Sequence, residues 1–504
     1  MKRIHQISEF FILFVFLGTM SFIYSFISVQ THNRYMTFGL DLGYFDEAIW
    51  KISRGIFPYS SAGCIWLLED HFQPILYLLA PLYRIWENVR IILIFQSFWM
   101  VFSALPLYLL SRKITRHVFL SLAIVFAYLF FIGTQFAILN EFHQVTFAPF
   151  FISLLYLAIE KDKRLIYWFC ILALFTIKED MALLVSAIGI GLLFRKGWRI
   201  RGGVTGILGF CVFILLVYVL VPLYSIKGVY GHFTHFKSVG GSRSPLGLIH
   251  ILFTDPLKVL QGLIGNPLKI HTIITSFFTF ITLPVFSPLF ILIPLLADFS
   301  FRFLYEGPQI TKWMLINHNA ATGAMLLAVS SVYASGKLGK KISNKKKKVF
   351  FIFIGIFLIL ATLMQDVILT APVHSFLKRN FYEREEWMRN NDAVISQVPT
   401  GVSVAAQNNL LPHLTERNSA YRLPYGLNSD YIILDFHDQP NAYAPLSYEE
   451  MKRFVSDWIL KDNRYSVVYK KGDAMLLKRN FKTDISKSPY YDNTHYCYYS
   501  FEER

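Results

Sequence analysis

Long apolar stretches alternate with short charged ones along the first three quarters of the chain. A helix needs about 20 apolar residues to cross the hydrocarbon core of a bilayer. By that measure we predict membrane spans at residues 10–27, 91–110, 118–138, 145–159, 204–223, 270–283, 286–301, 313–334 and 349–369. The pattern therefore predicts a mostly α-helical protein that crosses a membrane many times.

Residues 165–194 form a further apolar stretch, with basic clusters at both ends and Lys178, Glu179 and Asp180 at its midpoint. As a single span it would place three charges in the lipid core, at a cost of about 8 to 10 kcal/mol. We therefore predict two short helices that meet outside the membrane at these charges. They bring the predicted total to about eleven spans.

Basic residues at alternate ends of the spans indicate how the chain is oriented. Lys2 and Arg3 precede the first span, and later clusters read SRKITRH, EKDKR, RKGWRIR and KLGKKISNKKKK. Lys and Arg accumulate in cytoplasmic loops. We therefore expect a multi-pass plasma-membrane protein with a cytoplasmic N-terminus. The first apolar stretch lacks a small-residue cleavage site, so we expect it to remain as an anchor.

Two regions depart from the spanning pattern. Residues 67–86 are interrupted by Pro74 and Pro81, which predicts amphipathic or re-entrant helices within an outer loop of residues 29–89. After residue 371 the pattern predicts strands at 401–407 and 430–436, a helix at 448–463 and a hairpin at 465–479. We therefore predict a transmembrane domain of residues 1–371 and a small extracytoplasmic α/β domain of residues 372–504.

Composition narrows the class of protein. Of the 504 residues, 54% are hydrophobic and only 16% are charged, which is typical of a polytopic membrane protein. The formal net charge is +16, and the basic residues lie in short clusters between the predicted spans. We therefore expect the lipid bilayer as a partner and do not expect nucleic acid. The sequence has no GxGxxG, Walker A, HExxH or GxSxG motif and no internal repeat, which argues against nucleotide-driven transport and common hydrolases.

The four cysteines show no CxxC motif, which argues against a structural zinc site and a disulfide scaffold. A pairing of Cys64 with Cys497 outside the cell stays open.

The stretch TFGLDLGYFDEAIWKISRG, directly after the first span, contains the main candidates for chemistry: Asp41, Asp46 and Glu47. Carboxylates beside a bilayer are costly to desolvate, so they usually line a wet cavity or act in a reaction. The alternative is an ordinary solvated loop. The predicted topology places supporting candidates on the same side, namely Asp70, His71, Glu141, His143, Glu179, Asp180 and His318. His232 and His235 share that side, but we expect neither to be catalytic.

Acids mixed with bases suit a reaction in which a carboxylate activates an acceptor while cations hold a phosphate leaving group. Lys178, Lys237 and Arg243 are the candidate phosphate ligands, chosen by charge and by predicted side. Alternatively, Asp46 and Glu47 hold a divalent metal such as Mg²⁺ or Mn²⁺ that neutralises the phosphate.

Five blocks of the sequence resemble a known family. DLGYFDEAIW, EDHFQPILYLLAPLY, the FHQ site, LFTIKEDMALL and AAQNNLLPHLTER are similar, in order and spacing, to domain of unknown function 2079, a family of bacterial and archaeal membrane proteins. More distantly, a long span followed by an acidic outer loop resembles GT-C glycosyltransferases. Phe45, Asp46 and Glu47 resemble the FDE motif of protein O-mannosyltransferases.

The resemblance implies an inverting transfer of sugar from a polyprenyl-phosphate donor to an unknown acceptor. It implies Asp46 as the general base, with Glu47 supporting it or a metal, so Asp46→Asn is expected to abolish transfer in a folded protein. A transporter or flippase for a lipid-linked intermediate is the competing class, and a structural assembly protein is a third. Few charges lie in the inner halves of the spans, which favours the enzyme.

Overall fold

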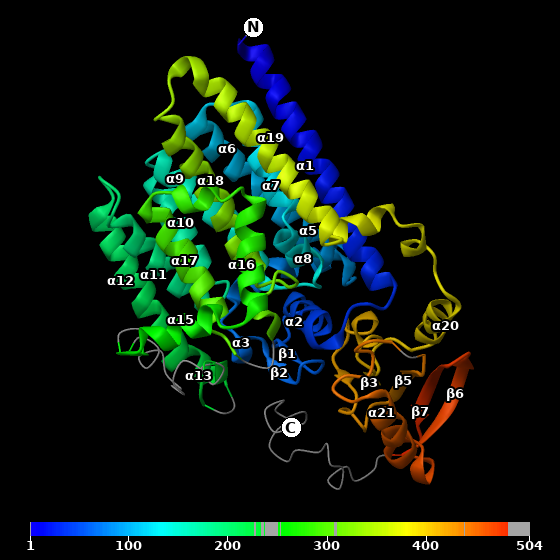
Figure 1. Ribbon diagram of the computed structural model, residues 1–504. Helices are drawn as coiled ribbons and strands as arrows, with labels where there is room; N and C mark the ends of the chain where they lie inside the picture. The colour runs from blue at the N-terminus through cyan, green and yellow to red at the C-terminus, as the bar shows by residue number, and fades with distance from the viewer. Residues whose placement is uncertain are drawn as a thin grey trace.

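The computed structural model describes residues 2–225, 228–232, 236, 250–251, 254–306, 310–437 and 439–481 (Figure 1). Most of these residues are helical, and the strands lie mainly near the C-terminal end. The α-helices are α1 Lys2–Asn33, α2 Tyr44–Ser53, α3 Leu67–Asp70, α4 Ala80–Ile85, α5 Arg90–Phe102, α6 Ala104–Thr115, α7 Val118–Phe130, α8 Ile132–Leu139, α9 Ala148–Glu160, α10 Arg164–Phe175, α11 Glu179–Leu192, α12 Arg199–Leu215, α13 Val221–Tyr224, α15 Pro256–Ile264, α16 Pro267–Thr279, α17 Leu289–Phe303, α18 Ala320–Gly339, α19 Asn344–Ile368, α20 Glu386–Ile395 and α21 Tyr448–Phe454.

Four helical segments in the described part of the chain are long and apolar enough to cross a membrane: Ile7–Asn33, Arg90–Thr115, Arg199–Tyr224 and Asn344–Ile368. The pair α7 and α8, bent by 51°, makes a fifth if it counts as one span. Helices α9, α10, α11 and α17 have only 12 to 15 residues. At 1.5 Å per residue, 15 residues extend about 22 Å, less than a bilayer core. The count of eleven spans therefore stays a prediction.

The apolar stretch at residues 165–194 is interrupted as predicted, because α10 ends at Phe175 and α11 begins at Glu179. Helix α11 then packs between α12 and α17. Its contact with α12 is unusually close: a Cβ on Gly189 would lie 2.1 Å from the backbone nitrogen of Gly206, and one on Gly209 would lie 2.5 Å from that of Ser186. Small residues allow such close approach between membrane helices.

A five-stranded sheet with the order β4-β3-β5-β7-β6 lies near the C-terminal end of the chain. Its strands are β3 Val404–Ala406, β4 Ala420–Arg422, β5 Tyr431–Asp435, β6 Tyr465–Lys471 and β7 Ala474–Arg479. The first three pair in parallel, and β7 is antiparallel to both β5 and β6. The predicted strands at 401–407 and 430–436 contain β3 and β5, and the predicted hairpin is β6 and β7, turning at Gly472 and Asp473.

Helices cover both faces of this sheet. Trp387 and Met388 of α20 pack on the face with Ile433, and Met451 and Phe454 of α21 pack on the face with Ile432. The core on the α20 side also includes Tyr35 and Ala62, which follow α1 in the sequence. The sheet is therefore packed against the first loop of the chain. The boundary of a separate domain at residue 371 stays a prediction.

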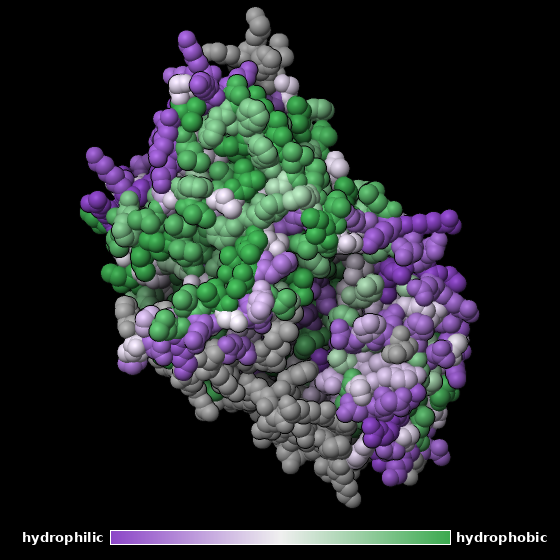
Figure 2. Space-filling view, in the orientation of Figure 1, coloured by the Kyte–Doolittle hydropathy of each residue, from purple (hydrophilic) through white to green (hydrophobic). Residues whose placement is uncertain are grey.

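Hydrophobic residues dominate the helical part on the face of the molecule that Figure 2 shows. Hydrophilic residues cover the sheet at the lower right, and others gather at the upper end, near the start of α1 and the turn between α18 and α19. A continuous apolar surface between two polar ends is typical of a protein embedded in a bilayer.

The small antiparallel ribbon of β1 Tyr59–Ser60 and β2 Ile65–Trp66 lies within the first loop.

Candidate functional site

The three acids that follow the first span lie on two consecutive elements. Asp41 is in a π-helical turn, Gly39–Gly43, and Asp46 and Glu47 are in the first turn of α2, where a helix dipole favours negative charge. The turn packs tightly against the C-terminal part of the chain, because a Cβ on Gly39 would lie 2.7 Å from Cδ2 of Leu411. The same glycine donates its N–H to the side chain of Asn408 at 3.0 Å.

Asp46 is completely buried. Its carboxylate accepts hydrogen bonds from the hydroxyl of Tyr83 in α4 and, at 2.5 Å, from the hydroxyl of Thr415. Burial raises the pKa of Asp46 well above its usual value, and the nearby charge of Glu416 acts in the same direction. Asp46 thus joins α2 to α4 and to the C-terminal part of the chain.

Glu47 is also completely buried. It pairs with Lys51 at 2.7 Å and accepts hydrogen bonds from the hydroxyl of Ser60 at 2.9 Å, the N–H of Ala62 at 2.9 Å and the hydroxyl of Ser61. Burial raises the pKa of Glu47, and the charge of Lys51 opposes this effect.

Every oxygen of the Asp46 and Glu47 carboxylates already accepts a hydrogen bond, so a metal ion between them would displace these donors. The arrangement of these residues fits such an ion poorly. Mg²⁺ or Mn²⁺ on this pair stays a prediction.

Asp41 is in a different state, because it is only partly buried and no described residue forms a hydrogen bond with its carboxylate. Burial raises the pKa of Asp41 to about 6, the charge of Asp70 acts in the same direction, and Arg422 opposes it. A carboxylate with a pKa near neutrality is suited to general base catalysis.

Glu141 holds the turn that carries Asp41. Its carboxylate accepts the N–H of Phe38 at 3.2 Å and the N–H of Leu42 at 2.9 Å. Burial raises the pKa of Glu141 well above its usual value, and the charge of Asp41 adds to the effect. The backbone of Glu141 has φ 55°, in the left-handed region that non-glycine residues adopt only at a cost. Glu141 therefore acts on the position of Asp41.

Asp70 and His71, at the end of α3, meet Glu179 at the start of α11 and His232. Nε2 of His71 lies 3.4 Å from Asp70, and Nε2 of His232 lies 3.1 Å from it. Nδ1 of His71 lies 2.8 Å from Glu179, and the two imidazole rings are stacked at 4.6 Å. Burial alone would raise the pKa of Asp70, but the charge of His71 and the hydrogen bond from His232 hold it well below its usual value.

Lys178 is 7% exposed, and its amine forms no hydrogen bond or ion pair with another described residue. Its charge acts on Asp70, on His143 and on His318, so it lies among them. The rings of His143 and His318 are stacked at 3.5 Å. Burial lowers the pKa of His143 to about 3, and the charge of Lys178 acts in the same direction. Both histidines are therefore neutral, and Lys178 is the cation of this group.

Lys312, in the short helix Ile310–Trp313 before α18, is a second cation that faces the same charges. It lies over the rings of Tyr305 at 4.4 Å and Phe301 at 5.2 Å. Burial lowers the pKa of Lys312 to about 8, and the charge of Lys178 acts in the same direction. We call Asp41, Asp70, His71, His143, Lys178, Glu179, Lys312 and His318 the charged cluster.

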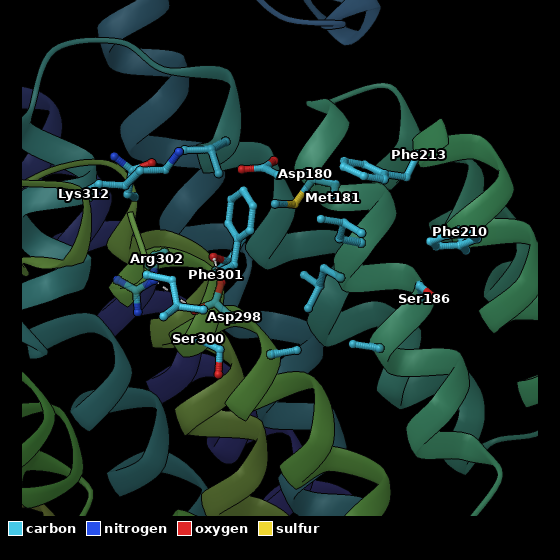
Figure 3. A pocket seen from close by; sticks show the side chains of 18 of the residues that line it. Asp180, Met181, Ser186, Phe210, Phe213, Asp298, Ser300, Phe301, Arg302 and Lys312 are labelled. Atoms are coloured by element: carbon cyan, nitrogen blue, oxygen red, sulfur yellow. Dashed lines mark hydrogen bonds and ion pairs between the residues drawn. The ribbon is translucent and has the colours of Figure 1, made fainter. Parts of the chain in front are cut away.

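An apolar cavity of about 470 Å³ lies between α11, α12, α17 and α18, and Lys312 is the member of the charged cluster that lines it (Figure 3). Phe210 and Phe213 lie on one side of it, and Lys312, Arg302 and Asp298 lie on the other. Asp180 and Phe301 lie between these sides.

Two polar atoms in this cavity lack hydrogen-bond partners among the described residues, namely Oδ1 of Asp180 and Nη1 of Arg302. A cavity with apolar walls and a few charged groups at one end suits an amphiphilic molecule.

The structure brings seven of the predicted site residues together in the charged cluster: Asp41, Asp70, His71, His143, Lys178, Glu179 and His318. It places others away from this cluster. Asp46 and Glu47 lie apart, since the charges that act on Asp46 are those of Glu416 and Glu47, outside the charged cluster. Lys237, Arg243, His235 and Cys497 lie outside the described residues, so the predictions for them are untested. Lys312, Arg302 and Asp298 were not predicted, although an isolated charge in or beside an apolar stretch is a usable signal.

Comparison with known proteins supports the resemblance. The family model described as "Predicted membrane protein (DUF2079)" matches residues 32–476, and the chain belongs to this family. No curated protein matches the sequence. Among solved structures, the fold is similar to that of ArnT from Cupriavidus metallidurans bound to undecaprenyl phosphate, with a TM-score of 0.51 and 10% identity over 92% of this chain and 97% of that one.

Proposed function

We propose that this member of the DUF2079 family is a GT-C-type glycosyltransferase, which transfers a sugar from a polyprenyl-phosphate donor to an acceptor on the extracytoplasmic side of the membrane. One observation carries the proposal: an apolar cavity of about 470 Å³ is lined by Lys312, and Lys312 belongs to a cluster in which Lys178, Lys312 and Asp41 form no ion pair with another described residue. The likeness in fold to an ArnT structure bound to undecaprenyl phosphate adds support.

The donor would lie with its isoprenoid chain in the cavity and its phosphate between Lys178 and Lys312. Both amines face the charged cluster without an ion pair to another described residue, and an amine held in a poorly solvated site binds phosphate strongly. Lys237 and Arg243 stay candidates for the same phosphate. The stacked, neutral rings of His143 and His318 would border the sugar.

Asp41 would act as the general base in place of Asp46, because Asp46 is buried and already bonded through both oxygens. In the inverting step, the acceptor oxygen attacks the anomeric carbon while its proton passes to Asp41. The bond between that carbon and the phosphate oxygen breaks, and the electron pair leaves on the polyprenyl phosphate. Lys178 and Lys312 would hold the charge that develops there.

Asp46 and Glu47 would support this reaction by holding the first loop against α4 and the C-terminal part of the chain. The finer topology belongs to the same proposal: eleven spans, a cytoplasmic N-terminus and an extracytoplasmic α/β domain of residues 372–504. The five-stranded sheet beside the first loop supports the last of these, and the basic loops between spans support the orientation.

The test uses the full chain in lipid nanodiscs and undecaprenyl phosphate as the probe, with binding followed by native mass spectrometry. We expect the wild type to bind it, and Lys178→Ala and Lys312→Ala each to weaken binding at least tenfold. Lys452→Ala removes an exposed lysine on α21 and serves as the control. Absence of binding by the wild type, or equal binding by all four proteins, would refute the proposal.

Release of undecaprenyl phosphate from undecaprenyl-phosphate-linked hexoses, with water or added alcohols as acceptors, then tests for transfer. We expect release by the wild type and none by Asp41→Asn. If the lipid-linked hexose, carrying a label, moves between leaflets and no undecaprenyl phosphate is released, the result would support the flippase instead.

A further inference from the structure

We infer that Asp70, His71 and His232 form a binding site for one divalent transition-metal ion. Each side chain offers one ligand atom, and the three atoms lie within 4.8 Å of one another. The inference concerns a site that differs from the predicted Asp46 and Glu47 pair, and it does not depend on the proposed transfer reaction.

Each histidine nitrogen lies at about the distance from the Asp70 carboxylate that two ligand atoms of one ion have from each other, and each faces a different oxygen of that carboxylate. The two oxygens of Asp70 face Nε2 of His71 at 3.4 Å and Nε2 of His232 at 3.1 Å. A tetrahedral ion with bonds of about 2.0 to 2.1 Å to nitrogen and oxygen separates its ligand atoms by about 3.3 Å. The two rings are stacked at 4.6 Å with 18° between their planes, and their contacts with Asp70 show that both Nε2 atoms lie on the same side.

Contacts behind His71 orient its ring as metal ligands usually require. Nδ1 of His71 lies 2.8 Å from Oε1 of Glu179, a residue that is 1% exposed. The carboxylate of Glu179 is itself held by the hydroxyl of Tyr230 at 2.7 Å and the N–H of Phe72 at 3.2 Å. Donation from Nδ1 to Glu179 leaves Nε2 of His71, on the side of Asp70, as the nitrogen that would release its proton and bind a metal, and such carboxylate partners are characteristic of metal-bound histidines.

The donor set indicates which ions the site would take. Two imidazole nitrogens and one carboxylate oxygen suit Zn²⁺ and similar transition metals, whereas Mg²⁺ and Ca²⁺ prefer oxygen ligands alone. Three protein ligands also leave a coordination position open to water or a substrate oxygen. The Asp46 and Glu47 pair offers neither histidine nor a free carboxylate oxygen.

The experiment measures Zn²⁺ bound to the full chain, purified in detergent without a polyhistidine tag, loaded with zinc sulfate and dialysed. We expect about one Zn²⁺ per wild-type chain by elemental mass spectrometry. Replacement by Co²⁺ is expected to give the visible absorption of a four-coordinate site. His71→Ala, His232→Ala and Asp70→Asn are each expected to lower the Zn²⁺ affinity at least tenfold. Glu179→Gln keeps all three ligands and is expected to lower it about 10- to 100-fold.

His374→Ala is the matched control, because His374 pairs with Asp366 at 2.7 Å but belongs to no group of three ligands among the described residues. Its Zn²⁺ content should equal that of the wild type. A wild-type chain that retains no Zn²⁺ would overturn the inference, and so would a folded His71→Ala, His232→Ala double variant that retains it. If the histidine variants fail to fold, Glu179→Gln and Asp70→Asn decide the question, and unchanged affinity in both refutes the site.

Discussion

Replacement of Asp41 by Asn is expected to abolish sugar transfer and at the same time to stabilise the folded protein. Both effects have the same cause, since Asp41 is a partly buried carboxylate to which no described residue donates a hydrogen bond. Burial and the charge of Asp70 oppose its ionisation. The ionised form that a general base requires is therefore the form that the fold disfavours.

The size of the effect follows from the pKa. Asp41 shifts from an ordinary value of 3.8 to about 6, and each pKa unit corresponds to about 1.4 kcal/mol, which gives at most about 3 kcal/mol. Because the folded-state pKa is the higher one, the stability that protonated Asp41 contributes is fully present below pH 3.8 and is lost as the pH rises through about 6. Asn is neutral throughout, so its advantage is complete above pH 6 and absent below pH 4.

Thermal unfolding in detergent at pH 7.5 and pH 4 measures this difference. An unfolding entropy of about 2 cal/mol/K per residue converts 3 kcal/mol into a rise of about 3 °C in Tm at pH 7.5 for a chain of 504 residues. Asp162→Asn, at a side chain that is 61% exposed, should leave Tm unchanged. A lower Tm for Asp41→Asn, or the same rise at pH 4, would refute the electrostatic reasoning, and retained transfer would refute the catalytic role.

Two further substitutions test the packing around the site. Glu47→Gln leaves Lys51 buried without its ion pair, so it should lower the free energy of unfolding by about 3 kcal/mol. A fall in Tm measures this loss, and an unchanged Tm would contradict the buried pair. Gly189→Ala places a Cβ 2.1 Å from the backbone of Gly206 and should lower the free energy of unfolding by about 1 to 3 kcal/mol, whereas Gly203→Ala, whose nearest contact is at 3.8 Å, should be tolerated. Equal Tm values for the two glycine variants would show that α11 and α12 can separate.

Hydropathy alone predicts the long helices, because segments such as Asn344–Ile368 are apolar over their whole length. The charged residues also predict the break before Glu179, because a continuous helix would bury three charges in lipid. Helix α20 and strand β4 were not predicted. Strand β4 contains only the three residues Ala420–Arg422, too few for an alternating pattern, and it is stabilised by its pairing with β3.

The candidate site shows where prediction from sequence ends. The sequence marks Asp41, Asp46 and Glu47 together as candidate acids, and the resemblance singles out Asp46 as the base. Their different states depend on residues remote in sequence: Tyr83 and Thr415, 37 and 369 positions after Asp46, bury and bond that carboxylate, whereas no described residue bonds that of Asp41. Such partners follow no local spacing, so only the folded chain distinguishes a structural acid from a reactive one.

The hydrogen bond between Thr415 and Asp46 also has a consequence for biosynthesis. Its two partners are 369 residues apart, and at about 5 to 20 residues per second the ribosome makes Thr415 roughly 20 to 75 s after Asp46. Asn408 is made equally late relative to Gly39, whose N–H it binds. The acidic first loop therefore spends that interval hydrated or held by other partners. A nascent chain that stops before residue 404 lacks both partners, Asn408 and Thr415, and therefore leaves this loop without the contacts that cover it in the finished protein.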